Sequence, residues 1–223
     1  MSGYLLEKFD LLQNPNFKDQ SLLSVLRDAF ENGVISQEEA IGIAIILFGA
    51  GGESTSALMG SSIYHLATKS EIQNELRKNN ELIVPFIEEV IRMSPPFRFH
   101  YRHVNSDCFL GGYPLVSGEK LLLSWDSANR DENQFDNPNE FSLKREKPKN
   151  HMGFGRGAHF CIGATLARLE VKIFIETLLE SFDQFKLKNE PCYLNSIFVR
   201  RFTSLEIEYM YLEIIYIHLI VIR

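Results

Sequence analysis

Residues 154–163 read Phe154-Gly155-Arg156-Gly157-Ala158-His159-Phe160-Cys161-Ile162-Gly163, and this stretch decides the fold. Its three glycines allow unusual backbone dihedral angles and close approach by another group. A helix is predicted to follow, from Ile162 to Phe182, so the loop brings the thiol of Cys161 to a helix N-terminus. Unpaired N–H groups at such an end stabilise a thiolate. The stretch therefore predicts a thiolate held against a large, flat cofactor.

Two other interpretations of this loop have to be weighed. A lone free cysteine is most often an inert residue of the core. The run Gly153 to Ala158 also fits G-x-G-x-x-A, a dinucleotide-binding fingerprint, which requires a buried strand directly before it. Residues 147–152 read Lys-Pro-Lys-Asn-His-Met, which does not predict a strand, so the fingerprint is disfavoured.

Composition limits the class of protein. The 223 residues are 45% hydrophobic and 23% charged, as in soluble globular domains, and a net charge of -6 gives no indication of nucleic-acid binding. Three distant cysteines, Cys108, Cys161 and Cys192, do not form a disulfide framework, which favours a cytoplasmic location. No uninterrupted apolar run reaches the roughly 18 to 20 residues that a membrane span needs, and we expect no membrane anchor.

Periodicity and turn residues predict a mainly α fold with a minor β-sheet component. Ser36 and Glu39 form a capping box at the start of a long apolar helix, in which Gly49, Gly51 and Gly52 predict a local distortion. The predicted helices cover residues 22–32, 37–68, 70–78, 86–93 and 162–182, and strands are expected in 97–123 and between 183 and 209.

A second constellation is the pair Glu89 and Arg92. Their spacing of three residues places both charges on one helix face, where they can form an ion pair. Glu88, the preceding residue, is expected to be an ordinary solvated carboxylate.

A third constellation is Ala50-Gly51-Gly52-Glu53-Ser54-Thr55, in the middle of the long apolar helix. A buried carboxylate and hydroxyls are costly unless they are satisfied or used. One interpretation is a surface-facing turn whose hydroxyls bond to carbonyls four residues earlier. The neighbouring glycines favour the other, a cavity in which these groups handle protons.

These segments, in this order, resemble the cytochrome P-450 family of haem-thiolate monooxygenases. The loop matches F-G-x-G-x-H-x-C-x-G, Glu89 and Arg92 match E-x-x-R, and residues 50–54 resemble A-G-x-[DE]-T, with Ser54 in place of the threonine. The resemblance covers about residues 4–209 and begins near the midpoint of family members. It implies an incomplete cytochrome P-450 fold that lacks the N-terminal half, with residues 1–209 as the haem-binding part and 210–223 as an unmatched apolar tail.

The resemblance also implies roles for individual residues. Cys161 becomes the axial ligand of the iron of haem b, a thiolate ligation that favours O–O cleavage. His159 and Arg102 become partners of the haem propionates, and Glu89 and Arg92 become structural. The remaining implied haem contacts are Phe154, Gly155, Gly163, Ala50 and Gly51. The implied proton relay consists of Glu53, Ser54 and Thr55.

The implied reaction is insertion of one oxygen atom from O2 into a small organic substrate, with electrons from a ferredoxin- or flavodoxin-like donor. Arg156, Arg168 and Lys172 are candidates for meeting that acidic donor, or are simply solvated. Two alternatives stay open. The chain is a non-catalytic haem-binding fragment of such an enzyme, or it is a haem-thiolate peroxygenase or isomerase.

Overall fold

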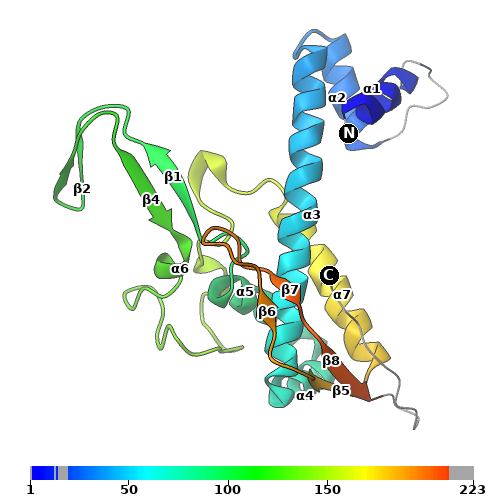
Figure 1. Cartoon of the computed structure of the whole chain (residues 1–223), viewed down its shortest axis with the longest axis vertical. Helices are drawn as coiled ribbons and strands as arrows, with labels where there is room; N and C mark the ends of the chain where they lie inside the picture. Colours follow the sequence, from blue (N-terminus) through cyan, green and yellow to red (C-terminus); the bar gives the residue numbers. More distant parts are fainter. Residues whose placement is uncertain (1, 13, 15–19, 211–223) are drawn as a thin grey trace. The chain divides into compact units, whose positions relative to one another are not determined.

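Helices dominate the part of the chain that the structure, a computed structural model, describes: residues 2–12, 14 and 20–210. About 50% of the chain is helical and 16% is in strands, which confirms the predicted mainly α fold with a minor β component. The chain divides into two units, residues 1–53 and 54–223, whose elements are labelled in Figure 1. Of the predicted apolar tail, everything from residue 211 onward lies outside the described residues.

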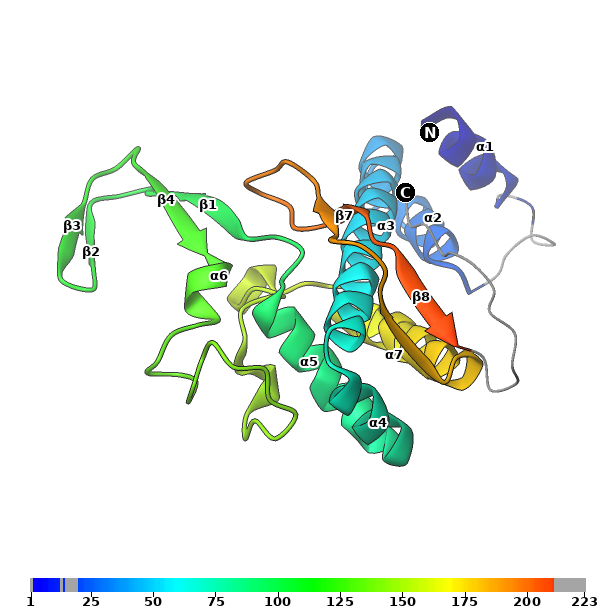
Figure 2. The ribbon, with the colours of Figure 1, turned by 60° about the horizontal axis from the view of Figure 1, so that its bottom comes forward.

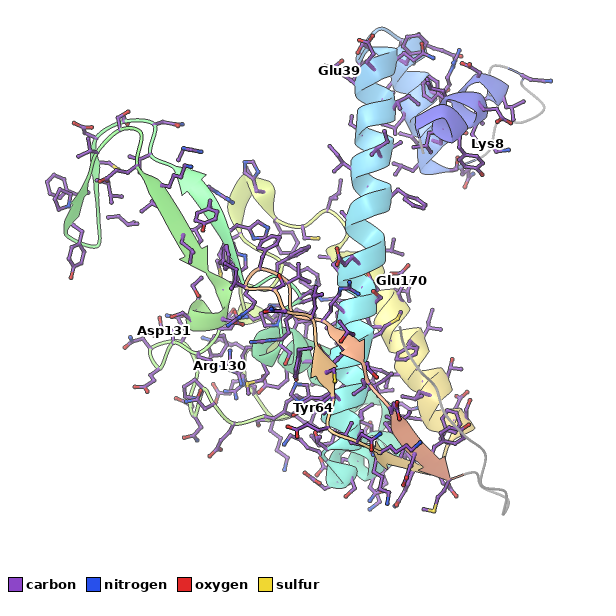
Figure 3. The ribbon with its side chains drawn as sticks, in the orientation of Figure 1. Lys8, Glu39, Tyr64, Arg130, Asp131 and Glu170 are labelled. Atoms are coloured by element: carbon purple, nitrogen blue, oxygen red, sulfur yellow. The ribbon has the colours of Figure 1, made fainter. Side chains whose placement is uncertain are left out.

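The first unit contains α1 (Ser2–Leu11), α2 (Leu22–Glu31) and the beginning of α3 (Gln37–Ala67). Its small core is formed by Phe9, Leu26, Ala40, Ile41 and Ala44. The predicted capping box is confirmed. The Ser36 N–H donates to Glu39 Oε2 at 2.7 Å and the Glu39 N–H donates to Ser36 Oγ at 3.1 Å, at the start of α3, where Figure 3 labels Glu39.

The distortion predicted at Gly49, Gly51 and Gly52 is wrong, because α3 runs through all three as an unbroken helix. No described atom outside the helix backbone lies within 4 Å of a Cβ built on any of them. Each glycine lowers helix stability only by roughly 1 kcal/mol, and turns already formed on both sides propagate through such positions.

The apolar character of α3 also bears on the membrane question. Among the described helices it alone is long and apolar enough to cross a membrane, with a mean hydropathy of 1.5 over an 18-residue window. Core helices of soluble proteins meet the same criteria, so the evidence is weak. The expected lack of a membrane anchor stays a prediction.

The second unit is built around α5 and α7, which pack against each other. Its core includes Leu66, Phe86, Val90, Val171 and Ile175. The predicted helices are present with shifted starts: α5 begins before Pro85, which fits within a first turn, and α7 begins after Gly163. Besides the end of α3, the helices are α4 (Ser70–Lys78), η2 (Asn80–Leu82), α5 (Ile83–Met93), α6 (Trp125–Ala128), η3 (Pro148–Asn150), η4 (Gly157–His159) and α7 (Ala164–Ser181).

The predicted strands form small antiparallel sheets within the described residues, each of two strands. The sheets are β1 (Phe99–His103) with β4 (Lys120–Ser124), β2 (Cys108–Leu110) with β3 (Tyr113–Leu115), β5 (Gln184–Leu187) with β8 (Ile207–Met210), and β6 (Cys192–Tyr193) with β7 (Phe202–Ser204). Gly111 and Gly112 turn the β2–β3 hairpin with φ values of 58° and 85°, as a tight hairpin turn requires. Figures 1 and 2 both show this hairpin at the far end of the β1–β4 ribbon.

Candidate functional site

A pocket of about 360 Å³ in residues 54–223 brings together many of the side chains that the sequence singled out. Apolar side chains, among them Leu58, Ile91 and Phe97, supply much of its wall. The predicted site residues that line it are Ser54, Thr55, Arg102, Phe154, Gly155, His159 and Cys161. Segments separated by about a hundred residues in the sequence therefore meet at one cavity.

The glycine-rich loop forms one wall of this pocket. Gly155 and Gly157 have φ values of 69° and 72°, a left-handed conformation that other residues adopt only with strain. The Gly155 N–H donates to the Met152 carbonyl at 2.8 Å, and the Cys161 N–H donates to the Phe154 carbonyl at 2.9 Å. The loop therefore closes on itself, and half-buried Cys161 lies at its end.

The helix after the loop starts later than predicted, which changes the surroundings of the thiol. Because α7 begins at Ala164, its first N–H donates to the Cys161 carbonyl at 3.3 Å. No hydrogen bond to Cys161 Sγ is formed by the residues that the structure describes. Cys161 thus lines the pocket, and its sulfur lacks the backbone hydrogen bonds that a helix start at Ile162 implied.

Gly153 fixes the loop against α5, because a Cβ at this position would clash with Cγ2 of Ile91 and lie 3.3 Å from the Ile91 carbonyl oxygen. We expect Gly153→Ala to lower the free energy of unfolding by about 1–3 kcal/mol, as overpacking does elsewhere. Urea unfolding measures the change. Gly42→Ala, at a helical position with open space around it, is expected to raise stability by up to about 1 kcal/mol. Equal effects of the two substitutions would contradict the packing argument.

Basic side chains stand at the pocket's edge. Arg102 and His159 are exposed there, and Arg102 donates to the Tyr101 carbonyl at 2.8 Å. The sequence analysis missed two further lining residues, His100 and Trp125. The Trp125 Nε1–H donates to His100 Nδ1 at 2.7 Å. Burial and the nearby Arg102 charge lower the pKa of His100. Trp125 is the only tryptophan in the sequence, and this was the one feature that could have marked it as a candidate site residue.

The helical constellation of α3 is divided between the two units. Ser54 is half-buried and Thr55 is buried, and both line the pocket. The expectation of a buried carboxylate is wrong, because Glu53 is exposed in the described structure. Ala50, Gly51 and Glu53 belong to residues 1–53, and their predicted roles stay predictions.

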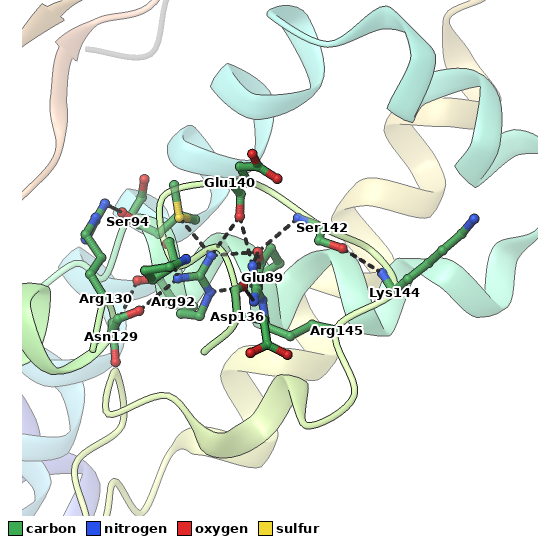
Figure 4. A network of polar contacts seen from close by, with 12 residues as sticks. Glu89, Arg92, Ser94, Asn129, Arg130, Asp136, Glu140, Ser142, Lys144 and Arg145 are labelled. Carbon is green, nitrogen blue, oxygen red and sulfur yellow. Dashed lines mark hydrogen bonds and ion pairs between the residues drawn. The ribbon is translucent and has the colours of Figure 1, made fainter. Parts of the chain in front are cut away.

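Glu89 and Arg92 form a fully buried ion pair on α5, with Arg92 Nη2 2.7 Å from Glu89 Oε1. Arg145, which the sequence analysis missed, adds a second guanidinium 2.9 Å from the same oxygen. Arg92 also donates to the carbonyls of Asn129 and Pro138 at 2.8 and 2.6 Å. Figure 4 shows how the network ties α5 to the segment before the loop.

The network keeps the Glu89 carboxylate charged. Burial tends to raise its pKa, but hydrogen bonds from Arg92, Arg145 and the Ser142 N–H outweigh burial and lower it. Glu89 and Arg92 therefore form a fixed ionic link between α5 and the segment before the loop. Glu89 stays ionised at neutral pH and takes no part in proton transfer there.

Glu88 corrects the prediction of a solvated carboxylate, because it is fully buried. Its oxygens accept from Arg168 Nε at 2.6 Å, Arg168 Nη2 at 2.9 Å and His151 Nε2 at 2.8 Å. Burial tends to raise its pKa, but these bonds and the Arg168 charge lower it to about 2. Arg168, a candidate for meeting an electron donor, is instead committed to this internal pair.

The donor set of the pocket suits one kind of group. Cys161 offers a thiol, Arg102 and His159 offer positive or hydrogen-bonding groups at the edge, and the rest of the wall is largely apolar. Within residues 2–12, 14 and 20–210, no group of three His, Cys, Asp or Glu side chains could hold a bare metal ion. The residues fit a flat, apolar cofactor with carboxylates at one edge. The dinucleotide alternative loses its required strand, because Pro148–Asn150 is a 3-10 turn.

Comparison with known proteins agrees with this interpretation of the pocket. The family model described as Cytochrome P450 matches residues 81–201. The protein called Cytochrome P450 144 from Mycobacterium tuberculosis is 45% identical over 208 residues, which cover 93% of this chain and 47% of the relative. A crystal structure of CYP109E1 from Bacillus megaterium with corticosterone superposes with a TM-score of 0.85 at 33% identity, over 92% of this chain and 56% of the other.

A second solved structure, CYP108D1 from Novosphingobium aromaticivorans, has a TM-score of 0.86 at 29% identity and covers 94% of this chain and 51% of the other. The chain spans about half the length of the curated relatives it matches.

Proposed function

The chain belongs to the cytochrome P450 family, and on that basis we propose that it is the haem-binding part of a monooxygenase that inserts one oxygen atom from O2 into an organic substrate. Members of the family bind haem b through a cysteine thiolate. The observation that carries the proposal is the pocket itself, which is lined by Cys161, by two basic residues, Arg102 and His159, and by Ser54 and Thr55 of α3.

We assign the pocket's residues as follows. Cys161 Sγ, as a thiolate, is the single protein ligand of the haem iron, and the ring of Phe154, at the start of the same loop, packs near the sulfur. Arg102 and His159 bind the propionates, while Gly155 and Gly163 let the loop approach the cofactor closely. Haem, when bound, supplies the activation of O2.

The hydroxyls of α3 deliver protons in this proposal. Ser54 and Thr55 line the pocket, so their Oγ atoms can hold and pass a proton, and the exposed Glu53 carboxylate takes protons from solvent. Ala50 and Gly51 contribute backbone next to the cofactor. Ser54 keeps the hydroxyl of the family's usual threonine and loses the methyl, and the adjacent Thr55 offers a second hydroxyl.

Electrons come, in this proposal, from a ferredoxin- or flavodoxin-like donor in the cytoplasm, which docks near Arg156 and Lys172. The substrate is a small organic molecule, and neither nucleic acid nor membrane takes part. A second candidate function is that of a non-catalytic haem-binding fragment of such an enzyme, which would bind the cofactor without turnover. A peroxygenase or isomerase is the remaining alternative, and the carboxylate at Glu53 argues against the peroxygenase.

The test is a spectrum of the haem-loaded chain, reduced and exposed to carbon monoxide. We expect the thiolate-type Soret band from which the family takes its name, because a thiolate ligand gives that signature. Cys161→Ala is expected to abolish it, while Cys108→Ala, which removes an exposed thiol, leaves it unchanged. An unaltered band in Cys161→Ala contradicts the ligand assignment. Turnover with a reductase and substrate then separates the enzyme from the non-catalytic fragment.

A further inference from the structure

We propose that His151 is a positioning residue that fixes the Cys161 loop, acting through its hydrogen bond to the backbone of Gly153 and anchored by Glu88. The inference rests on the proposed function for its meaning, since the loop it fixes carries the proposed haem ligand. Its first measurement, however, is made on the chain without haem.

The anchor is a set of three charged or polar side chains from separate segments, of which Glu88 and His151 are buried. Glu88 lies on α5, Arg168 lies on α7, and His151 lies just before the loop. His151 is 4% exposed and Glu88 is 0% exposed. A buried carboxylate is stable only when it is paired and hydrogen-bonded, and Glu88 meets this condition only while His151 and Arg168 stay in place.

The hydrogen bonds fix the tautomer of His151. The Gly153 N–H donates to His151 Nδ1 at 3.2 Å, so Nδ1 is the acceptor and the proton lies on Nε2, which donates to Glu88 Oε2 at 2.8 Å. One imidazole therefore joins a rigid anchor on α5 to the backbone at the start of the loop. No other protonation pattern satisfies both contacts.

A second branch runs from the same anchor to Phe154, whose carbonyl group holds the backbone of Cys161. The Arg168 guanidinium, paired with Glu88, lies 4.5 Å from the centroid of the Phe154 ring, and the Phe154 carbonyl accepts the Cys161 N–H at 2.9 Å. The two branches thus end on neighbouring residues, Gly153 and Phe154. Glu88 reaches both through side chains and touches neither directly.

The adjacent residue Met152 is also held in place, but by Asn129 and not by Glu88. Its N–H donates to Asn129 Oδ1 at 2.6 Å, and Asn129 Nδ2 donates to the Arg92 carbonyl at 3.1 Å. Each residue from His151 to Phe154 is therefore tied to a helix or to a buried side chain. Partners of this kind, behind a metal ligand, set its orientation, and their loss commonly weakens metal affinity about 10- to 100-fold.

Two amide substitutions separate the contacts of His151. His151→Asn places an amide oxygen where Nδ1 stands, so it keeps an acceptor for the Gly153 N–H and loses the bond to Glu88. His151→Gln places an amide where Nε2 stands, so it keeps the bond to Glu88 and loses the acceptor. Gln73→Ala serves as the control for general destabilisation. Gln73 is 1% exposed, and its bonds run to Leu66 and Phe185, away from the loop.

The first measurement is hydrogen exchange of the loop amides of Gly155 and Cys161 in the full chain without haem. We expect His151→Gln to raise their exchange about tenfold, the effect of losing one net hydrogen bond, and His151→Asn, which keeps the contact with Gly153 and loses only the anchor on Glu88, to raise it less. Gln73→Ala is expected to raise the exchange of these two amides no more than that of other amides in residues 54–210. Equal exchange in the Asn and Gln variants overturns the proposal, as does loop exchange in His151→Gln that only matches Gln73→Ala.

The second measurement uses the haem-loaded chain. We expect His151→Gln to bind haem about tenfold or more weakly and to lose a larger share of the thiolate-type band per bound haem than His151→Asn does. Identical bands in both variants overturn the positioning role. If the wild-type chain binds no haem at all, the proposed function fails, and the exchange comparison still decides the role of His151.

Discussion

Glu89→Gln is expected to lower the free energy of unfolding by about 3–5 kcal/mol, the usual result of removing one partner from a buried ion pair. The substitution leaves the Arg92 and Arg145 guanidinium groups buried with no anion between them. The loss is large against a total stability of about 5–15 kcal/mol for a typical domain. Urea unfolding, followed by circular dichroism, measures it as a lower midpoint.

Glu176→Gln is the matched control, because Glu176 pairs with Lys172 on the partly exposed face of α7. Such helix pairs contribute only about 0.3–0.5 kcal/mol. Similar midpoints for Glu89→Gln and Glu176→Gln would show that the buried network does not hold the unit together. A Glu89→Gln chain that is already unfolded in buffer is the stronger form of the expected result.

Acidification from pH 6.5 to 4 is expected to lower stability by about 3 kcal/mol through His65 alone. Burial and the nearby Lys69 charge lower the pKa of this histidine from 6.5 to about 4. In that interval the unfolded chain binds a proton that the folded chain excludes. The stability that comes from keeping His65 neutral is therefore fully present above pH 6.5 and is lost as the pH falls to 4.

His65 is 7% exposed, its Nε2 lies 3.1 Å from Ser94 Oγ, and Nδ1 has no hydrogen-bond partner in the described part of the chain. In His65→Gln we expect the fall between pH 6.5 and 4 to be largely absent in urea unfolding. His103→Gln, at an exposed strand position, keeps the wild-type dependence. A His65→Gln chain with the same acid slope as wild type contradicts the assignment.

The two neighbouring glutamates show where inference from sequence succeeds and where it stops. Spacing along a helix identifies the pairing of Glu89 with Arg92, since residues three apart lie on the same helix face. The partners of Glu88 lie 63 and 80 residues away, and no local rule reports contacts at that separation. Arg145, 56 residues from Glu89, was missed for the same reason.

Helix faces give a second example. On α7, Val171 and Ile175 are buried, while Leu166 and Ile173 are 58% and 53% exposed. Periodicity locates apolar residues but does not say which apolar face is covered in a given chain. The same limit explains the prediction for Glu53, where an apolar helix implied burial and the structure shows exposure.

The candidate site was predictable to the extent that its residues belong to short motifs. Cys161, His159 and Phe154 came from the loop, and Arg102 came from the resemblance. His100 and Trp125 are brought together because β1 pairs with β4 and Trp125 directly follows β4. That pairing depends on register, which the sequence of either strand alone does not determine.

The distance between Glu88 and its partners has a consequence for the order of events during synthesis. At about 5–20 residues per second, Arg168 is added roughly 4 to 16 s after Glu88, a separation of 80 residues. Throughout that interval the nascent helix α5 carries a carboxylate whose counter-charge has not yet been made. Because α5 packs against α7, the buried surroundings of Glu88 are completed only after α7 has left the ribosome.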